Sequence, residues 1–260
     1  KTAGEYIPEL KRCAFGDATI RELLDMTTNI RYSEDYSDPK AEVWQFSQAG
    51  NVFRPANYSG YRNFYEYIVT VKKGDGEHGE KFAYKTINTD VLAWVISRVT
   101  GKNIAELLSE KIWQPMGAHH DGYYQVDASG IPFAGGGFNG NLRDCALFGE
   151  MVRNGGNING RKIMDKSILY DIVLGGDPAK FDSKSYPNLK GWSYRNMWWV
   201  TNNANRAFMA RGVHGQAIYV DPAAQMVIVR LASHPKASNA VNDPYSLPAY
   251  QAIADYLIKK

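Results

Sequence analysis

The chain has 260 residues, of which 44% are hydrophobic and 22% charged, a composition typical of globular domains with a large core. Its formal net charge is only +3 and its basic residues are scattered among acids, so nucleic acid is not an expected partner. No apolar run approaches the roughly 20 residues of a membrane span. Two cysteines, Cys13 and Cys145, are too few for a disulfide framework or a thiolate metal site.

The first part of the chain opens on an extended segment, residues 1–10, with no element of its own ahead of it. We therefore expect the chain to continue from an earlier part of a longer protein. Thr19 is the predicted N-cap of a short helix over residues 20–26. Residues 31–62 are polar and aromatic, and they predict a loop that contains a helical piece at 42–49.

A longer amphipathic helix follows Tyr84. Either Asn88 or Thr89 is its predicted N-cap, and Gly101 supplies its stop. The apolar residues repeat at the three-to-four spacing that places them on one face: Val91, Leu92, Val95, Ile96 and Val99. Tyr84 is therefore expected on an irregular turn just ahead of a well-anchored helix, a place that can hold a phenol rigidly.

The remaining elements change in character along the chain. Helical patterns are predicted over residues 63–71, 103–117, 141–154, 165–174 and 245–260, with a hairpin over 157–164. Strands are predicted near residues 122–126, 192–200, 207–211, 216–220 and 226–232. This order indicates an α+β fold with an antiparallel sheet and a helix packed on its face. We expect one domain over 1–260, helical to about 155 and strand-rich from about 156.

Residues 82–90 follow the pattern aromatic-x-Tyr-x-Thr-x-Asn-Thr-Asp and lead into the helix that ends at Gly101. This stretch resembles the second motif of the serine β-lactamase and penicillin-binding-protein superfamily. The similar branch contains class C β-lactamases, family VIII carboxylesterases and 6-aminohexanoate-dimer hydrolases. The resemblance implies a β-lactamase/transpeptidase-like fold, with an antiparallel sheet flanked by helices. It also implies proton transfer by Tyr84 and a substrate contact by Thr86.

A second match lies before this motif, because residues 18–30 resemble the segment that follows the nucleophile helix in the same branch. A third match lies after it. Residues 208–222 resemble the strand that carries Lys-Thr-Gly in β-lactamases, and residues 212–216 are similar to the version in 6-aminohexanoate-dimer hydrolases. The three matches occur in the family's order, which makes coincidence a poor explanation.

Matching the strand registers places residues 210–212, Ala-Arg-Gly, at the Lys-Thr-Gly position. The resemblance then implies that the Val213 N–H binds the oxyanion and that Arg211 and Gly212 contact the substrate. His214 either contacts the substrate or braces the turn. The alanine at the lysine position departs from the β-lactamase pattern and weakens the case for a β-lactam carboxylate, for which Arg211 could compensate.

In this superfamily the nucleophile is the serine of a Ser-x-x-Lys string on a helix, where the spacing puts both side chains on one face. Two such strings occur here, Ser37 to Lys40 and Ser233 to Lys236. Both place proline directly before the lysine, and neither opens an apolar helix in which desolvation could lower the lysine pKa. We therefore expect the serine, its lysine and the first strands of the family's sheet to lie outside this chain, which alone would be inactive.

Two other motifs have ordinary explanations. Residues 135–140 fit Gly-x-Gly-x-x-Gly, but the βαβ unit and the later acid of a dinucleotide site are missing, so they are predicted to form the entry to the helix at 142. Residues 119–121, His-His-Asp, are consecutive and point in different directions, and no third histidine lies at ligand spacing. No metal and no cofactor is predicted.

The resemblance thus predicts a serine hydrolase that cleaves an amide or ester bond of a small molecule through an acyl-enzyme. The alternative is a non-catalytic binding or sensing domain of the same fold. A further arrangement is a two-piece enzyme in which the missing N-terminal segment is a second chain and this chain's partner. Superfamily members are often exported, which favours a periplasmic or exported protein over a cytoplasmic one.

Overall fold

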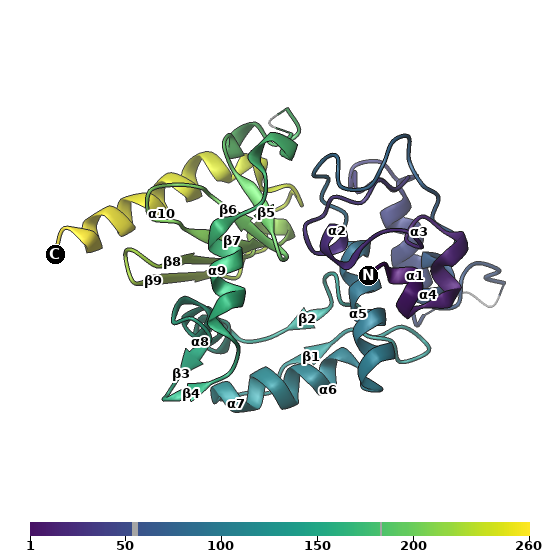
Figure 1. Cartoon of the computed structure of the whole chain (residues 1–260), viewed down its shortest axis with the longest axis horizontal. Coiled ribbons are helices and arrows are strands. Elements are labelled where there is room, and N and C mark those ends of the chain that lie inside the picture. Colours follow the sequence, from purple (N-terminus) through teal and green to yellow (C-terminus); the bar gives the residue numbers. More distant parts are fainter. Residues whose placement is uncertain (54–56, 183) are drawn as a thin grey trace. The chain divides into compact units, whose positions relative to one another are not determined.

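We describe the fold from a computed structural model, which describes residues 1–53, 57–182 and 184–260. The chain forms two compact units (Figure 1). The first comprises Lys1–Ser109 and Gly122–Asn139, and the second comprises Glu110–Asp121 and Gly140–Lys260. Within the described ranges, no helix is both long and apolar enough to cross a membrane.

Helices form most of the regular secondary structure of the first unit, and short polar side chains start several of them. The side chains of Thr19, Asn63 and Asn103 each accept a hydrogen bond from the backbone N–H three residues on. Its helices are α1 (Ala3–Tyr6), α2 (Ile20–Leu24), α3 (Glu42–Ala49), α4 (Phe64–Ile68), α5 (Ile87–Thr100) and α6 (Ile104–Leu108), with a 3₁₀ turn at Pro8–Arg12. The two-residue strands β1 (Tyr123–Tyr124) and β2 (Phe138–Asn139) pair antiparallel.

Helix α5 is the centre of the first unit, and α1, α2, α4 and α6 all pack against it. Gly101 ends it in the left-handed conformation, as predicted. The predicted N-cap at Asn88 or Thr89 is wrong, because the helix begins at Ile87 and the Asn88 side chain is buried among tertiary partners. The predicted apolar face is also only partly buried. Ile96 is 44% exposed and Val99 is 62% exposed, because only the first turns of α5 are enclosed by neighbouring segments.

Aromatic side chains form the rest of the core of the first unit. Phe46 lies at its middle, with ring centroids 4.9 Å from Phe64, 5.5 Å from Tyr67 and 6.4 Å from Tyr32. Phe133, from the loop between β1 and β2, stacks on Phe64 at 5.4 Å. This packing fixes the loop around Tyr32 and the loop around Phe133 against the same helices.

The second unit combines a five-stranded sheet with longer helices. Its helices are α7 (Gln114–Met116), preceded by a π-helical turn at Ser109–Trp113, then α8 (Leu142–Arg153), α9 (Lys166–Leu174) and α10 (Asp243–Ile258). A small hairpin pairs β3 (Asn157–Ile158) with β4 (Arg161–Lys162). The large sheet contains β5 (Ser193–Arg195), β6 (Trp198–Val200), β7 (Phe208–Arg211), β8 (Ala217–Asp221) and β9 (Met226–Arg230). 3₁₀ turns occur at Pro178–Lys180, Pro187–Leu189, Val213–Gly215 and Asn239–Val241.

The five strands are antiparallel and follow one another in chain order, so each pairs with the next. The strand predicted near 192–200 is in fact the hairpin of β5 and β6. Asn196 and Met197 both have positive φ, 49° and 68°, which is the backbone of a tight hairpin turn.

Helices cover both faces of this sheet, and neighbouring residues of β8 show which helix covers which face. A Cβ on Gly149 of α8 would lie 3.1 Å from the side chain of Ile218. The next residue, Tyr219, points to the other face, where its ring lies 5.2 Å from that of Tyr250 on α10. The predicted α+β fold with an antiparallel sheet flanked by helices is therefore confirmed.

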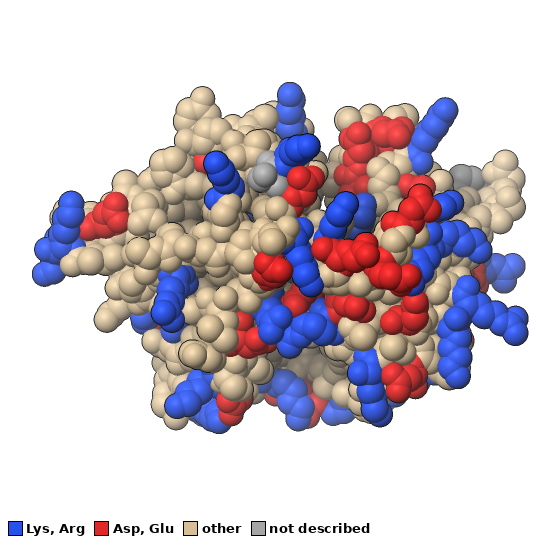
Figure 2. Space-filling view, turned by 45° about the horizontal axis from the view of Figure 1, so that its top comes forward, with Lys and Arg blue, Asp and Glu red and all other residues tan. Residues whose placement is uncertain are grey.

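The two compact units do not divide the chain at residue 155, because α8 packs on β8 and β9 and belongs with the sheet. The single domain predicted over 1–260 stays a prediction. Figure 2 shows acidic and basic side chains mixed on the face it displays, without an extended surface of one sign.

Candidate active site

Tyr84 lies in irregular backbone directly ahead of α5, as predicted, and is half-buried. Contacts remote in sequence hold the residues on both sides of it. The Ala83 N–H donates to the Met26 carbonyl at 2.9 Å, and the Lys85 ammonium donates to the Tyr32 carbonyl. Burial lowers the pKa of Lys85, although Glu34 and Glu42 oppose the shift. The Tyr84 backbone is thus fixed by tertiary contacts rather than by local secondary structure.

Thr86 is buried, and its N–H and its hydroxyl both donate hydrogen bonds to one carboxylate. Its N–H donates to Oε1 of Glu34, and its hydroxyl donates to Oε2 at 3.0 Å. These bonds argue against the predicted substrate contact by Thr86, because the hydroxyl is already used inside the unit. Glu34 was missed by sequence reasoning, since it lies 52 residues away in a segment with no motif.

Asp90, in the first turn of α5, joins the helix to the glycine-rich loop. Its Oδ1 accepts hydrogen bonds from the N–H groups of Ala134 at 2.8 Å and Gly135 at 3.3 Å. A Cβ on Gly135 would lie 2.2 Å from a methyl carbon of Thr86, so only glycine fits there. The glycine motif therefore closes over the start of α5, and it forms no dinucleotide-binding βαβ unit in the described part of the chain.

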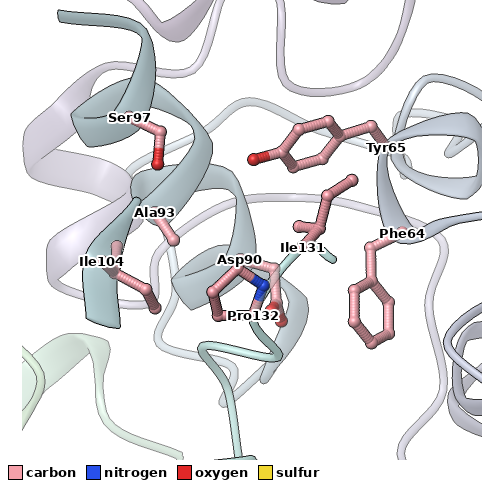
Figure 3. Close-up of a pocket in the computed structure, with 8 residues that line it drawn as sticks. All are labelled: Phe64, Tyr65, Asp90, Ala93, Ser97, Ile104, Ile131 and Pro132. Carbon is pink, nitrogen blue, oxygen red and sulfur yellow. The ribbon is translucent and has the colours of Figure 1, made fainter. Parts of the chain in front are cut away.

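The other oxygen of Asp90, Oδ2, is buried and has no hydrogen-bond partner among the described residues. A cavity of about 10 Å³, which is room for about one water molecule, lies beside the Asp90 side chain. Figure 3 shows its lining, which includes Tyr65 and Ser97 as well as apolar side chains. Burial raises the pKa of Asp90 to about 8, against the two backbone donors, so this carboxyl is mostly protonated at neutral pH.

In the second unit, β7 and β8 are joined by the turn at Val213–Gly215. The Gly212 N–H donates to the Gln216 carbonyl at 2.9 Å, and its carbonyl accepts from the Asn239 side chain at 2.8 Å. Val213 is 43% exposed, and its N–H has no hydrogen-bond partner within the described part of the chain. The turn therefore leaves free the one donor that the sequence assigns to the oxyanion, whereas the backbone of Gly212 is already used.

His214 braces this turn. It adopts the left-handed conformation, with φ 57°, and its N–H donates to the Ala237 carbonyl at 3.0 Å. Its Nδ1 lies 2.7 Å from the His234 carbonyl, and since a carbonyl only accepts, Nδ1 carries the proton. Of the two predicted roles, the structure shows the bracing contacts directly.

Arg211 is committed to a buried ion pair. Its Nη2 donates to both oxygens of Asp243 in α10, at 2.6 and 2.8 Å, and its side chain is only 7% exposed. The guanidinium also lies over the ring of Trp199, at 5.0 Å from its centroid. On β7, Arg211 faces α10, where its guanidinium is buried beside Asp243. The geometry argues against the predicted substrate contact.

Neither Ser-x-x-Lys string has the geometry of a nucleophile. Ser37 lies in an exposed turn and donates to the Asp35 carboxylate at 2.5 Å. Ser233 is exposed, and the residues from it to Lys236 are not helical. Serine and lysine thus do not share a helix face in either string.

Comparison with known proteins adds to this geometry. The family model described as Beta-lactamase matches residues 1–251. A 6-aminohexanoate-dimer hydrolase of Paenarthrobacter ureafaciens is 34% identical over 232 residues, which are 89% of this chain and 58% of that protein. Among solved structures, "Putative 6-aminohexanoate-dimer hydrolase from Bacillus anthracis" is 36% identical with a TM-score of 0.86, over 100% of this chain and 66% of that one.

A family VIII carboxylesterase has the same fold, with a TM-score of 0.60 and 16% identity over 94% of this chain and 75% of that one. The chain spans less than two thirds of the length of either 6-aminohexanoate-dimer hydrolase.

The buried carboxyl of Asp90 predicts a pH-dependent stability. The unfolded chain releases this proton near 3.8, the ordinary pKa of an aspartate, whereas the folded state keeps it to about pH 8. As the pH rises from about 4 to 8, the folded state is therefore progressively destabilised relative to the unfolded state. Asp90→Asn keeps an acceptor oxygen and has no charge, so the free energy of unfolding of this variant should decline less as the pH rises.

Urea unfolding at pH 5, 7 and 9 measures the effect as a free energy of unfolding. The variant should gain stability relative to the wild type as the pH rises, by at most about 1.4 kcal/mol per pH unit. Asp121→Asn, at an exposed position, is the matched control and should run parallel to the wild type. Parallel curves for Asp90→Asn would show that Asp90 is ionised in the folded state.

Proposed function

Since the chain belongs to the beta-lactamase family, we propose that it supplies part of the active site of a serine hydrolase that acts through an acyl-enzyme. The proposed substrate is a small molecule with an amide or ester bond. Similarity to 6-aminohexanoate-dimer hydrolases supports a linear amide of that kind. The observation that carries the proposal is the Val213 N–H, which has no partner among the described residues, on a turn where the N–H groups of Gly212 and His214 are engaged.

In the proposed reaction, a serine hydroxyl attacks the carbonyl carbon while its proton passes through the lysine of the Ser-x-x-Lys motif to Tyr84. The Val213 N–H and the serine N–H hold the oxyanion of the tetrahedral intermediate. Tyr84 then gives a proton to the leaving amine or alcohol, and water hydrolyses the acyl-enzyme. The serine and the lysine are proposed to lie outside this chain, which is supported by the unsuitable geometry of both strings found here.

The oxyanion assignment can be tested by removing a single N–H. Val213 is the first residue of its 3₁₀ turn, a position that proline favours, and Gly212 has φ −113° and ψ 163°, which is compatible with a following proline. In the complete protein that carries the serine, Val213→Pro should lower kcat by roughly 10²–10³-fold. Val213→Ala keeps the N–H and should stay within a few-fold. Equal turnover by the two variants would remove Val213 from the mechanism.

The role of Tyr84 is tested by Tyr84→Phe in the same protein. Loss of the hydroxyl should lower kcat by roughly 10²–10⁴-fold, the usual contribution of a general acid or base, while the ring keeps the fold. Circular dichroism and the unfolding midpoint should match the wild type. Turnover by Tyr84→Phe at the wild-type rate would mean that another group moves the proton.

A serine-reactive phosphonate separates the hydrolase from a non-catalytic binding domain of the same fold. We expect intact mass spectrometry of the wild-type protein to show one phosphonyl adduct, on the polypeptide that carries the Ser-x-x-Lys motif. An adduct on a separate, co-purifying polypeptide would indicate a two-piece enzyme. The absence of any adduct on the complete protein would favour the binding domain.

A further inference from the structure

Tyr84 has no helix or strand to hold it, yet the backbone around it is tied to the segment that contains Tyr32 and Glu34. Two successive residues after Tyr84 make these ties. The Lys85 ammonium reaches the Tyr32 carbonyl, and Thr86 gives both its N–H and its hydroxyl to the Glu34 carboxylate. Three donors thus converge on two residues that lie more than fifty positions earlier in the chain.

Glu34 replaces a local helix cap. Thr86 occupies the N-cap position of α5 but makes no side-chain cap bond to the helix, because its hydroxyl points instead to Glu34. The carboxylate accepts the Thr86 N–H at the positive end of a 14-residue helix, where a negative charge is favourable. The start of α5 therefore depends on a remote side chain.

The segment that presents Glu34 is itself well anchored. The ring of Tyr32 is 4% exposed and packs edge-on against Phe46 and Tyr67. The Ser33 N–H donates to the Glu42 carboxylate at 2.8 Å, and the Ser33 carbonyl accepts from Val43. Glu34 thus extends from residues fixed by the aromatic core and by α3.

From these contacts we infer that Glu34 is a positioning residue for Tyr84. Its carboxylate fixes Thr86 by two hydrogen bonds and thereby sets the place of the phenol two residues earlier in the chain. A displacement of about 1 Å at a reacting group can cost about 10²-fold in rate, so the hold on Thr86 bears directly on turnover. The consequence for turnover rests on the function proposed above, whereas the hold on the backbone does not.

The charge of Glu34 supports this role. Burial raises its pKa to about 7, while the Thr86 bonds and Lys85 act in the opposite direction. The titratable groups that face it are Lys85, Asp90, Tyr32 and Tyr36. Protonation would remove the negative charge from the start of α5 and weaken the hold on Thr86 as the pH falls below about 7, because hydrogen bonds to an ionised acceptor are the stronger ones.

Glu34→Gln tests the inference, because the amide keeps one acceptor oxygen but replaces the other with a donor. Amide hydrogen exchange at pH 8 measures the hold on residues 84–86 in the chain itself. We expect at least tenfold faster exchange in Glu34→Gln and in Thr86→Val, which lacks the hydroxyl. Thr86→Ser keeps both donors and should restore protection. Asp35→Asn removes an exposed neighbouring charge and should leave the exchange unchanged.

Kinetics of the complete protein supply the second readout. We expect kcat to fall by roughly 10–10²-fold in Glu34→Gln and in Thr86→Val, with KM nearly unchanged. The double variant should show no further loss, because both substitutions act on the same contact between residues 34 and 86. Thr86→Ser and Asp35→Asn should turn over like the wild type. Unchanged exchange in Glu34→Gln would overturn the inference, and so would faster exchange with unchanged kcat.

The two readouts separate the inference from the proposed function. If the wild type hydrolyses no amide or ester, the proposed function fails, and the exchange data alone then decide whether Glu34 holds the Tyr84 segment. If the wild type is active and only the exchange prediction fails, the function stands and Glu34 has no positioning role. Unfolding midpoints for each variant exclude global destabilisation as the cause of faster exchange.

Discussion

The polar first turns of α5 are the constraint on which the first unit depends. Asn88 is fully buried and accepts a hydrogen bond from the Thr28 hydroxyl at 2.7 Å, while Asp90 holds the loop at Ala134 and Gly135. An unpaired buried polar group costs roughly 1–3 kcal/mol, so the helix cannot shift its start without breaking several bonds at once. The irregular segment before α5 is attached to this fixed start, and Tyr84 therefore has a defined position although it lies in no helix or strand.

A buried ion pair has a comparable part in the second unit. Arg211 ends β7 and Asp243 begins α10, so their pairing ties the end of the central strand to the helix that covers the sheet. Removing one partner of such a pair typically costs roughly 3–5 kcal/mol, because the other charge is left buried. The turn that follows β7 is further held by His214 and Asn239. Val213 lies within this braced turn, and in the described part of the chain its N–H has no partner, whereas the N–H groups of Gly212 and His214 do.

Much of the fold could be predicted because its signals are local. Thr19, Asn103, Asn141 and Asp165 were predicted at helix starts, and each accepts the hydrogen bond that a cap should. The start of α5 could not be predicted in this way. Its cap-like residue Asn88 lies inside the helix, and the side chain is satisfied by Thr28, which lies 60 residues earlier. The role of Glu34 could not be predicted for the same reason, since no spacing rule connects residues that come into contact only after folding.

The sequence by itself determined the family and the α+β class, and it predicted Tyr84 and Val213 as site residues, because motifs and helix caps are encoded by neighbouring residues. Only the tertiary structure decided which of the predicted polar groups are available and which are engaged inside the protein. Arg211 and Thr86 were predicted to contact substrate, but both side chains are buried, with Nη2 of Arg211 donating to Asp243 and the Thr86 hydroxyl donating to Glu34. The predicted donor, the Val213 N–H, has no hydrogen-bond partner among the residues that the structure describes. The physical reason is that a polar group becomes available or engaged according to partners that folding brings from distant parts of the chain.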